Sequence, residues 1–463
     1  MAHPALQPLE VEASLIQGHA HAPALDDAAW LNAARAAALA RFADGGLPHR
    51  RSEAYRYFDL RQMLAKAGPL ELLDADLPRD VSGVSGVDDA GQVFAALDRH
   101  IAIVVNGRLD LARSSLDALP DGVTVMGFAE AARAGAAWFT QAMHHATQDA
   151  DAGLDPVTAL NLAYATKGVA VHVAAGVRVD KPLEVVWLST GPASAHYHAH
   201  SVISVGDSAA LTLLETRGDA ASAPLFATLA LTAQVGAQAL FRHAALYADA
   251  KTSVRVGQKS VQINAHARYE TLGLAVGAGR ARTNEHVHFA GEHAFASLNG
   301  LSLLAGTAVM DNTLFVDHAV PNCQSVETYR AVLDEKARGV FQGTIRVREQ
   351  AQKIDAQMQA RALLLSRQAE MNVKPMLEIY ADDVVCAHGS AIGEPDEDAI
   401  FYLMSRGIGE STARALLVAG FLDDVVDGFD AGAIGGHIKH LLAQRLGAPE
   451  DFADAATTME MGE

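Results

Sequence analysis

Short runs of apolar and β-branched residues recur between about residue 165 and residue 345, separated by glycine or polar turns. In the first run, Val169, Val171 and Val173 alternate with Ala170 and His172, which is the two-residue period of a half-buried strand. No long amphipathic helix intervenes, so this stretch predicts an all-β unit. Two architectures suit regular short strands, a sandwich or barrel and a solenoid such as a β-helix, and spacing alone does not choose between them. Further runs of this kind are Ser201–Val205, Ala210–Leu214, Ser253–Val256 and Ser260–Ile263.

Helical patterns precede the β unit. Residues 26–44 are rich in alanine, carry apolar side chains at helical spacing and stop at Gly45-Gly46. Residues 88–150 mix the short apolar run Ile101–Val105 with helical stretches such as 127–145. We therefore expect a mixed, mostly helical N-terminal region over residues 1–150, followed by a β core over residues 151–392.

Helical spacing returns after Gly389. Pro395 precedes three acidic residues that suit the first turn of a helix, and Gly407 supplies the stop. A second helix is expected to begin at a Ser411 cap, and a third contains Ile438. The sequence thus predicts a C-terminal helical domain over residues 393–448 and an acidic, disordered tail over residues 449–463.

The composition excludes several classes of function. The 463 residues carry a formal net charge of −19, with 36 basic against 55 acidic side chains, which argues against binding to nucleic acid or an anionic membrane. Two widely separated cysteines, Cys323 and Cys386, indicate a reducing compartment. The first residues lack the pattern of a signal peptide, and no apolar run is long enough for a membrane helix, so we expect a cytoplasmic protein.

Cys386 and His388 are the candidate site residues with the clearest chemistry. If their segment is a strand, residues two apart point to the same face, and a thiol and an imidazole lie side by side. Both groups bind iron in iron–sulfur proteins, although two ligands cannot hold a cluster and the others would come from elsewhere. On residue pattern alone, such a pair is more often a packed cysteine beside a hydrogen-bonded histidine.

Two histidine sets offer a weaker metal-site hypothesis. His196, His198 and His200 alternate, and a second set consists of His286, His288 and His293. Three imidazoles on one strand face can bind zinc, copper or nickel. We interpret both sets instead as lining a solvated strand face, and a metal-binding module remains the weaker alternative.

Catalytic motifs are absent from the sequence. No phosphate-binding loop occurs, since Gly277-Ala-Gly279 lacks the lysine and the following helix. There is no Gly-x-Ser-x-Gly elbow, and Cys386 shares a strand with its histidine rather than facing it across a cleft. A β-helical carbohydrate-active enzyme stays open as an alternative, but no convincing pair of carboxylates can be assigned to it. We expect a protein without catalytic activity of its own.

The last third of the chain carries the most specific pattern. Its distinctive segments are His318–Pro321, Phe341–Ile345, Ala351–Lys353, Leu363–Ser366, Lys374-Pro375, Leu377–Ile379, Asp383-Val384, Cys386–Gly389 and Phe401–Gly407, with a weaker one upstream around Glu53–Tyr57. In these segments the chain resembles the SufB/SufD family of iron–sulfur cluster assembly proteins, and in particular its SufD branch. The family usually has Cys-Ser-His-Gly-Ala-Thr where this chain has Cys386-Ala-His-Gly-Ser-Ala391, which keeps both candidate ligands.

The resemblance implies a right-handed parallel β-helix flanked by helices. It also implies that residues 347–371 are β-helix coils, although these residues are good helix formers and propensity alone would predict a helix. We follow the resemblance here, because stacking against neighbouring coils can override local preference.

The resemblance also implies partners and site residues. A SufB-like paralogue would meet this chain near His388 and Cys386, with a transient cluster or iron at the interface and no cofactor stably bound by this chain alone. A SufC-like ABC ATPase would contact the C-terminal helices through Phe401, Tyr402, Arg406 and Gly407. A homodimer, and flavin in the assembled complex, are further expectations. The alternative within the family is a SufB-like scaffold, which two cysteines suit poorly.

Overall fold

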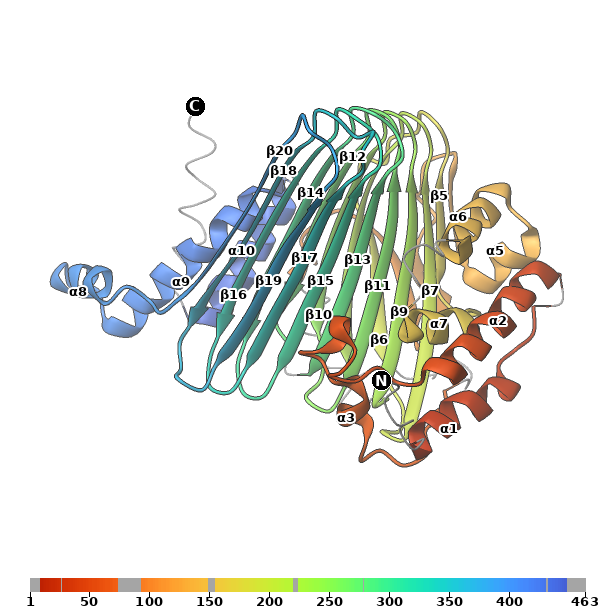
Figure 1. Cartoon of the computed structure of the whole chain (residues 1–463), viewed down its shortest axis with the longest axis horizontal. Coiled ribbons are helices and arrows are strands. Elements are labelled where there is room, and N and C mark those ends of the chain that lie inside the picture. Colours follow the sequence, from red (N-terminus) through yellow and green to blue (C-terminus); the bar gives the residue numbers. More distant parts are fainter. Residues whose placement is uncertain are drawn as a thin grey trace.

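A computed structural model of the chain describes residues 9–25, 27–73, 93–148, 155–219, 224–277, 279–429 and 432–447. Strands make up 43% of the structure and helices 25%, and the strands wind into a parallel β-solenoid with helices before and after it. Figure 1 shows the strands stacked along the long axis, with the N-terminal helices at one end and the C-terminal helices toward the other. The prediction of a mainly β, β-helical core is therefore confirmed. The acidic tail predicted over residues 449–463 lies outside the described residues.

Each coil contributes one strand to each of two parallel sheets, which we call the odd sheet and the even sheet. The odd sheet contains β5 (Val169–Val173), β7 (Ala195–Val205), β9 (Phe226–Val235), β11 (Val254–Ile263), β13 (Arg280–Phe289), β15 (Val309–His318), β17 (Arg338–Val347) and β19 (Glu370–Ile379). The even sheet contains β6 (Leu183–Ser189), β8 (Ala210–Asp219), β10 (Leu240–Ala248), β12 (Arg268–Ala275), β14 (Phe295–Leu304), β16 (Gln324–Leu333), β18 (Asp355–Leu364) and β20 (Val385–Gly393). The N-terminal region adds β1 (Glu71–Leu72) and β4 (Val123–Gly127) to the odd sheet, and β2 (His100–Val105) and β3 (Arg108–Ser115) to the even sheet.

The strands pair in register, so side chains form columns along the solenoid axis. Inward-facing positions of both sheets fill one continuous core, for example Val261 and Phe289 of the odd sheet and Phe241 of the even sheet. Neighbouring strands bury one another's apolar side chains, and each coil therefore depends on the coil next to it. The sequence shows only separate short strands, because the pairing partner of each strand lies in another coil.

One corner of the coil repeats the same backbone conformation. Ser208, Gln238 and His266 follow strands of the odd sheet with φ angles of 57°, 61° and 58°, and each donates its amide to a carbonyl of the next coil. A Cβ at Gly236, two residues before Gln238, would lie 2.6 Å from the Asp207 amide nitrogen of the preceding coil. The glycine and polar turns seen in the sequence are thus the places where coils approach most closely.

Residues 347–371 form strands, as the family resemblance implied and against their helix propensity. In β18 the inward positions Ala356, Met358 and Ala360 are buried, whereas the alternate positions Gln357 and Gln359 are exposed. The two-residue period is therefore present but is made from alanine, methionine and glutamine, which are helix formers. Pairing with β16 and β20 in register stabilises the strand conformation.

The N-terminal helices cover the outer face of the odd sheet (Figure 1). They meet outward-facing residues such as Val202, Phe226 and Val256. The predicted helix over residues 26–44 is confirmed, as is the helical character of residues 127–145. The elements are α1 (Glu10–Gln17), η1 (Gly18–His21), α2 (Ala29–Gly45), η2 (Glu53–Tyr55), α3 (Leu60–Leu64), α5 (Phe128–Ala134), α6 (Ala137–Gln148) and α7 (Pro156–Ala163).

The C-terminal helices are α8 (Glu397–Ser405), α9 (Glu410–Asp427) and α10 (Ala433–Leu446). Helices α9 and α10 pack on the outer face of the even sheet, where Leu422 and Val425 meet Leu272 and Leu301. The predicted Ser411 cap is wrong, because the cap is Gly409 and Ser411 lies inside the first turn. Among the described residues, no helix combines the length and apolar character needed to cross a membrane.

Candidate interface site at the open end of the solenoid

The solenoid ends at β19 and β20, and among the described residues no strand pairs with their outer edges. Large apolar side chains are exposed there. Val385 is 66% exposed, and Tyr380 and Ile392 are also open to solvent. An uncovered, apolar strand edge is a template for pairing with another chain. This open end is therefore a candidate interface.

Cys386 and His388 lie on β20, the last strand of the even sheet. Cys386 pairs with Ala356 of β18, and His388 pairs with Met358. Both partners belong to the solenoid core, so the cysteine and the histidine share the inward face at the open end, as the sequence predicted. Cys386 is half-buried and His388 is exposed. Burial raises the pKa of the Cys386 thiol, and the acidic groups of Glu327 and Asp355 raise it further.

Glu327 is a neighbouring group that sequence reasoning missed. It pairs in register with Met358, so Glu327, Met358 and His388 form one column on β16, β18 and β20. The side chain is 0% exposed, and neither carboxylate oxygen has a hydrogen-bond partner among the described residues. Burial raises the pKa of Glu327 to about 8. A buried carboxyl without a partner is rare, and its burial could be inferred only from the coil register.

Glu327→Gln is expected to stabilise the protein at pH 8 and to change its stability little at pH 5. In the folded chain the carboxyl keeps its proton up to about pH 8, whereas the unfolded chain releases it near the ordinary value of 4.5. The stabilisation from this proton is complete below pH 4.5 and is lost as the pH rises to about 8. The difference in unfolding free energy between variant and wild type should therefore grow by roughly 3 kcal/mol from pH 5 to pH 8.

Urea unfolding at the two pH values measures this difference. Glu349→Gln is the matched control, because Glu349 is exposed and the substitution removes the same charge. Parallel stability profiles for Glu327→Gln and wild type would mean that the Glu327 carboxyl is ionised and solvated in the folded chain.

The row of His196, His198 and His200 is not on a solvated face, and that interpretation is wrong. All three side chains are buried beneath the N-terminal helices, and the ring of Tyr164, the residue after α7, stacks on His198 at 4.5 Å. His196 Nδ1 lies 2.9 Å from His198 Nε2. Burial lowers the pKa of His196 and of His200 to about 4, so these imidazoles are neutral at pH 7. The row holds the N-terminal helices on the odd sheet.

The three histidines of the second set lie in three different environments. His286 packs edge-on against Phe315, and His288 Nδ1 lies 2.8 Å from Asp317 Oδ2. His293 lies at a coil corner, where its ring stacks on His266 at 4.9 Å. Across the part of the chain that the structure describes, no three histidine, cysteine or acidic side chains are arranged to hold a metal ion.

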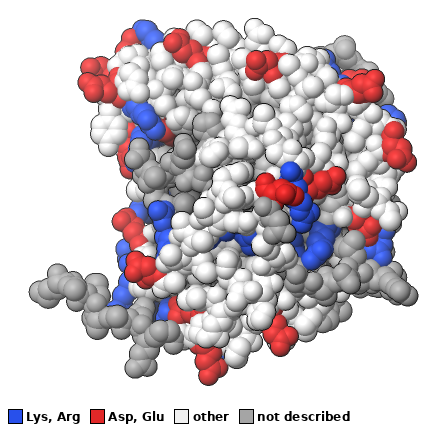
Figure 2. Space-filling view, turned by 90° about the vertical axis from the view of Figure 1, so that its right-hand side faces the viewer, with Lys and Arg blue, Asp and Glu red and all other residues white. Residues whose placement is uncertain are grey.

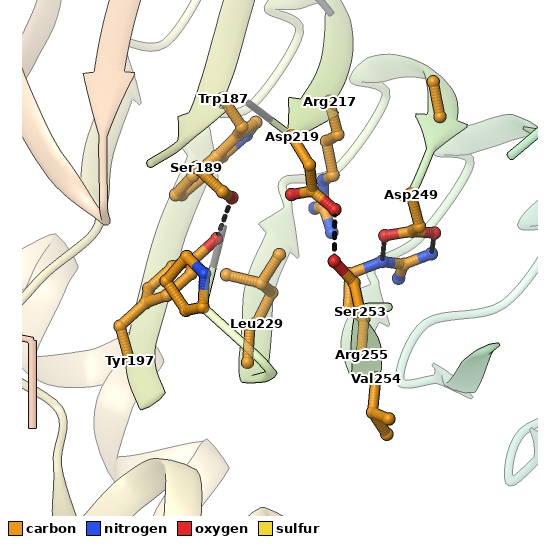
Figure 3. A pocket seen from close by; sticks show the side chains of 13 residues that line it. Trp187, Ser189, Tyr197, Arg217, Asp219, Leu229, Asp249, Ser253, Val254 and Arg255 are labelled. Atoms are coloured by element: carbon orange, nitrogen blue, oxygen red, sulfur yellow. Dashed lines mark hydrogen bonds and ion pairs between the residues drawn. The ribbon is translucent and has the colours of Figure 1, made fainter. Parts of the chain in front are cut away.

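Two interior carboxylates come close together in the early coils, and they test the carbohydrate-enzyme alternative (Figure 3). Asp249 accepts two hydrogen bonds from Arg255, at 2.7 and 2.8 Å, and Asp219 accepts one from Ser253 at 2.6 Å. The cavity beside them measures about 20 Å³, which is room for one water molecule. A sugar ring cannot enter this cavity, so this pair cannot act on a glycosidic bond.

The four residues assigned to the ATPase contact lie on and just after α8, which projects from the body of the molecule (Figure 1). Phe401 is 72% exposed, and Tyr402 and Met404 are also exposed. Arg406 lies over the Tyr402 ring at 5.1 Å, and Gly407 ends the helix with a φ of 90°. The helix therefore presents aromatic side chains to solvent beside one cation.

Comparisons with known proteins agree with this geometry. The model of the SufBD core domain of the SUF iron–sulfur cluster assembly system matches residues 188–421, and that of the SufBD N-terminal region matches residues 13–185. An iron–sulfur cluster assembly SufBD family protein of Synechocystis is 26% identical over 86% of this chain and 87% of its own length. The SufD proteins of Escherichia coli and Bacillus subtilis are 29% and 24% identical, over 60% and 58% of this chain and 66% and 62% of their own lengths. The chain belongs to the SufB/SufD family of iron–sulfur cluster assembly proteins, on the side of its SufD members.

Proposed function

We propose that this chain is a non-catalytic subunit of an iron–sulfur cluster assembly complex, and that it pairs with a SufB-like paralogue through the open end of its solenoid. The observation that carries the proposal is the uncovered edge of β19 and β20, where apolar side chains surround Cys386 and His388. A second β-helix could continue the sheets across this edge, adding main-chain hydrogen bonds and covering Val385 and Ile392.

The nascent cluster is the cargo of this interface. Cys386 supplies one thiolate and His388 one imidazole, and the partner supplies the remaining ligands, because a cluster needs about four. Cys323 cannot help, since its side chain is buried in the core and its thiol contacts the carbonyls of Gly291 and Pro321. One thiol at the open end suits a chain that completes a partner's site, and it disfavours the alternative of a sole cluster scaffold. We propose iron supply at this interface, and flavin binding, only for the assembled complex and not for this chain alone.

The ATPase partner docks on α8. Aromatic residues and arginine are among the residue types that most often dominate binding at interfaces. Because α8 is followed directly by α9, which packs on the even sheet, a movement of the ATPase could reach the solenoid through rigid elements. In this proposal the ATPase hydrolyses ATP and this chain transmits the movement to the open end.

The pairing can be tested by co-expressing the chain with the SufB-like and ATPase proteins of its own organism. The double variant Val385→Glu, Ile392→Glu places two carboxylates in the proposed interface, and it should reduce co-purification of the paralogue at least roughly tenfold, since buried unpaired charge is costly. Leu111→Glu is the control, because Leu111 is an equally exposed apolar residue on β3 at the other end of the solenoid. Undiminished recovery of the paralogue with the double variant would contradict the proposal.

A further inference from the structure

A cavity of about 540 Å³ lies at the end of the solenoid away from the open end, and it plays no part in the proposed function. Four segments distant in sequence enclose it. They are the segment before α2 (Pro23 and Leu25), the turn between β2 and β3, the start of α5, and the loop between α7 and β5. A pocket of this size is in the range that holds small organic ligands, roughly 300–1,000 Å³.

Backbone hydrogen bonds hold one wall of the cavity in place. The Gly168 amide donates to the Gly107 carbonyl at 2.7 Å, and the Gly168 carbonyl accepts from the Phe128 amide at 2.9 Å. Gly168 has a φ of 132°, and a Cβ there would lie 2.0 Å from the His200 carbonyl oxygen. Glycine is therefore required where the loop, the β2–β3 turn and α5 are joined.

Side chains of α2 hold the opposite lip. Arg35 Nη1 donates to the Pro23 carbonyl at 3.0 Å, and Asn32 Nδ2 donates to the Leu25 carbonyl at 2.8 Å. Arg35 is buried and donates to three uncharged groups: the carbonyls of Pro23 and Ala163 and the Asn32 amide oxygen. The cavity therefore has preformed walls on both sides, and ordering these segments adds little to the cost of binding.

The lining is basic in a chain that is otherwise strongly acidic. Arg108, Arg133 and Lys167 line the cavity together with one acid, Glu130, and Arg35 adds positive charge behind the lip. The Lys167 ammonium already donates to the Leu73 carbonyl. The whole chain has a net charge of −19, so this is a local reversal of its field. Figure 2 views the molecule from the side of α2, α5 and α6, where a few Lys and Arg side chains, with Asp or Glu side chains beside them, lie near the middle of a largely uncharged face.

Apolar groups complete the lining. Pro23 and Leu109 are partly exposed and provide a surface for a flat or aliphatic part of a ligand, whereas Leu25 and Phe128 are buried behind them. Phe128 is held by edge-on packing against Phe139 at 5.1 Å, so its ring is fixed before binding. A charged end and an apolar end in one cavity are the two features that select an amphipathic organic anion.

We propose that this cavity binds an organic phosphate of mononucleotide size, with the phosphate on Arg108 and Arg133 and the organic part against Pro23 and Leu109. Guanidinium groups bind phosphate through two parallel hydrogen bonds. The site is separate from the open end, so it is independent of pairing with the paralogue.

The test is titration of the full chain with a fluorescent mononucleotide, N-methylanthraniloyl-AMP, followed by anisotropy. We expect saturable binding that unlabelled AMP displaces and that weakens with added salt. Arg133→Glu reverses the charge of an exposed lining residue and should weaken binding at least roughly tenfold, and Arg108→Gln should also weaken it. Arg445→Glu, the same charge change on exposed α10, should leave binding unchanged.

Three results would overturn the inference. These are the absence of saturable binding, an equal loss of affinity in Arg133→Glu and Arg445→Glu, and displacement by inorganic phosphate as effective as displacement by AMP. The last result would leave the apolar half of the cavity without a role. Circular dichroism of each variant confirms that it is folded before its affinity is compared.

Discussion

Replacing His196, His198 and His200 together with alanine is expected to lower the free energy of unfolding by about 5 kcal/mol and the melting temperature by about 5 °C. The three imidazoles are buried between the odd sheet and the N-terminal helices. Removing them leaves cavities under α7 and leaves the hydroxyls of Thr228 and Thr232 without their imidazole partners. Thermal and urea unfolding followed by circular dichroism measure the loss.

The control for this variant is the double substitution His266→Ala, His293→Ala. These two histidines stack on each other at exposed coil corners, so their removal should change stability by less than about 1 kcal/mol. A triple variant as stable as wild type would mean that the N-terminal helices do not pack on this row. Unchanged stability is the result expected if the three histidines lay on a solvated face.

The second large effect concerns the ATPase contact. The double variant Phe401→Glu, Tyr402→Ser is expected to weaken binding of the SufC-like ATPase at least roughly thirtyfold, because buried aromatic anchors carry about 2 kcal/mol or more each at interfaces. Both side chains are exposed on α8, so the chain should fold normally. Binding is measured by titrating the purified ATPase against the immobilised chain.

Leu365→Glu is the matched control, since Leu365 is an exposed apolar residue on the loop after β18. Equal affinity of wild type and the Phe401, Tyr402 variant would place the ATPase contact elsewhere. Deleting the whole region 396–446 is not a usable test. Helices α9 and α10 bury Leu422, Val425 and Ile438 against the even sheet, so the deletion would uncover an apolar face.

Local sequence patterns were sufficient to place the strands but not to pair them. The sequence predicts two separate strands, Ser253–Val256 and Ser260–Ile263, whereas the structure has one strand, β11, across both. Lys259 lies in the gap between the runs, and it points inward to an ion pair with Glu285 of the next strand. A buried lysine looks like a loop residue when its partner is a coil away, and the stacking of coils had to come from the family resemblance.

The candidate site was likewise only partly predictable from the sequence. The shared face of Cys386 and His388 follows from spacing two residues apart along a strand. The burial of the His196 row depends on α5 and α7, which pack over it from other parts of the chain. Glu327 could not be recognised because its environment is set by coils about thirty residues before and after it, and nothing in its local sequence distinguishes it from a surface glutamate.

The most direct test of the account is the iron and sulfide content of the complex that contains His388→Ala. The chain is co-expressed with its SufB-like and ATPase partners, the complex is purified without oxygen, and iron, acid-labile sulfide and visible absorption are measured per complex. His293→Ala, an exposed histidine at a coil corner, is the control. We expect both complexes to assemble, and iron and sulfide to fall by roughly tenfold with His388→Ala alone. Equal iron and sulfide in the two complexes would contradict the role of the open end in cluster formation.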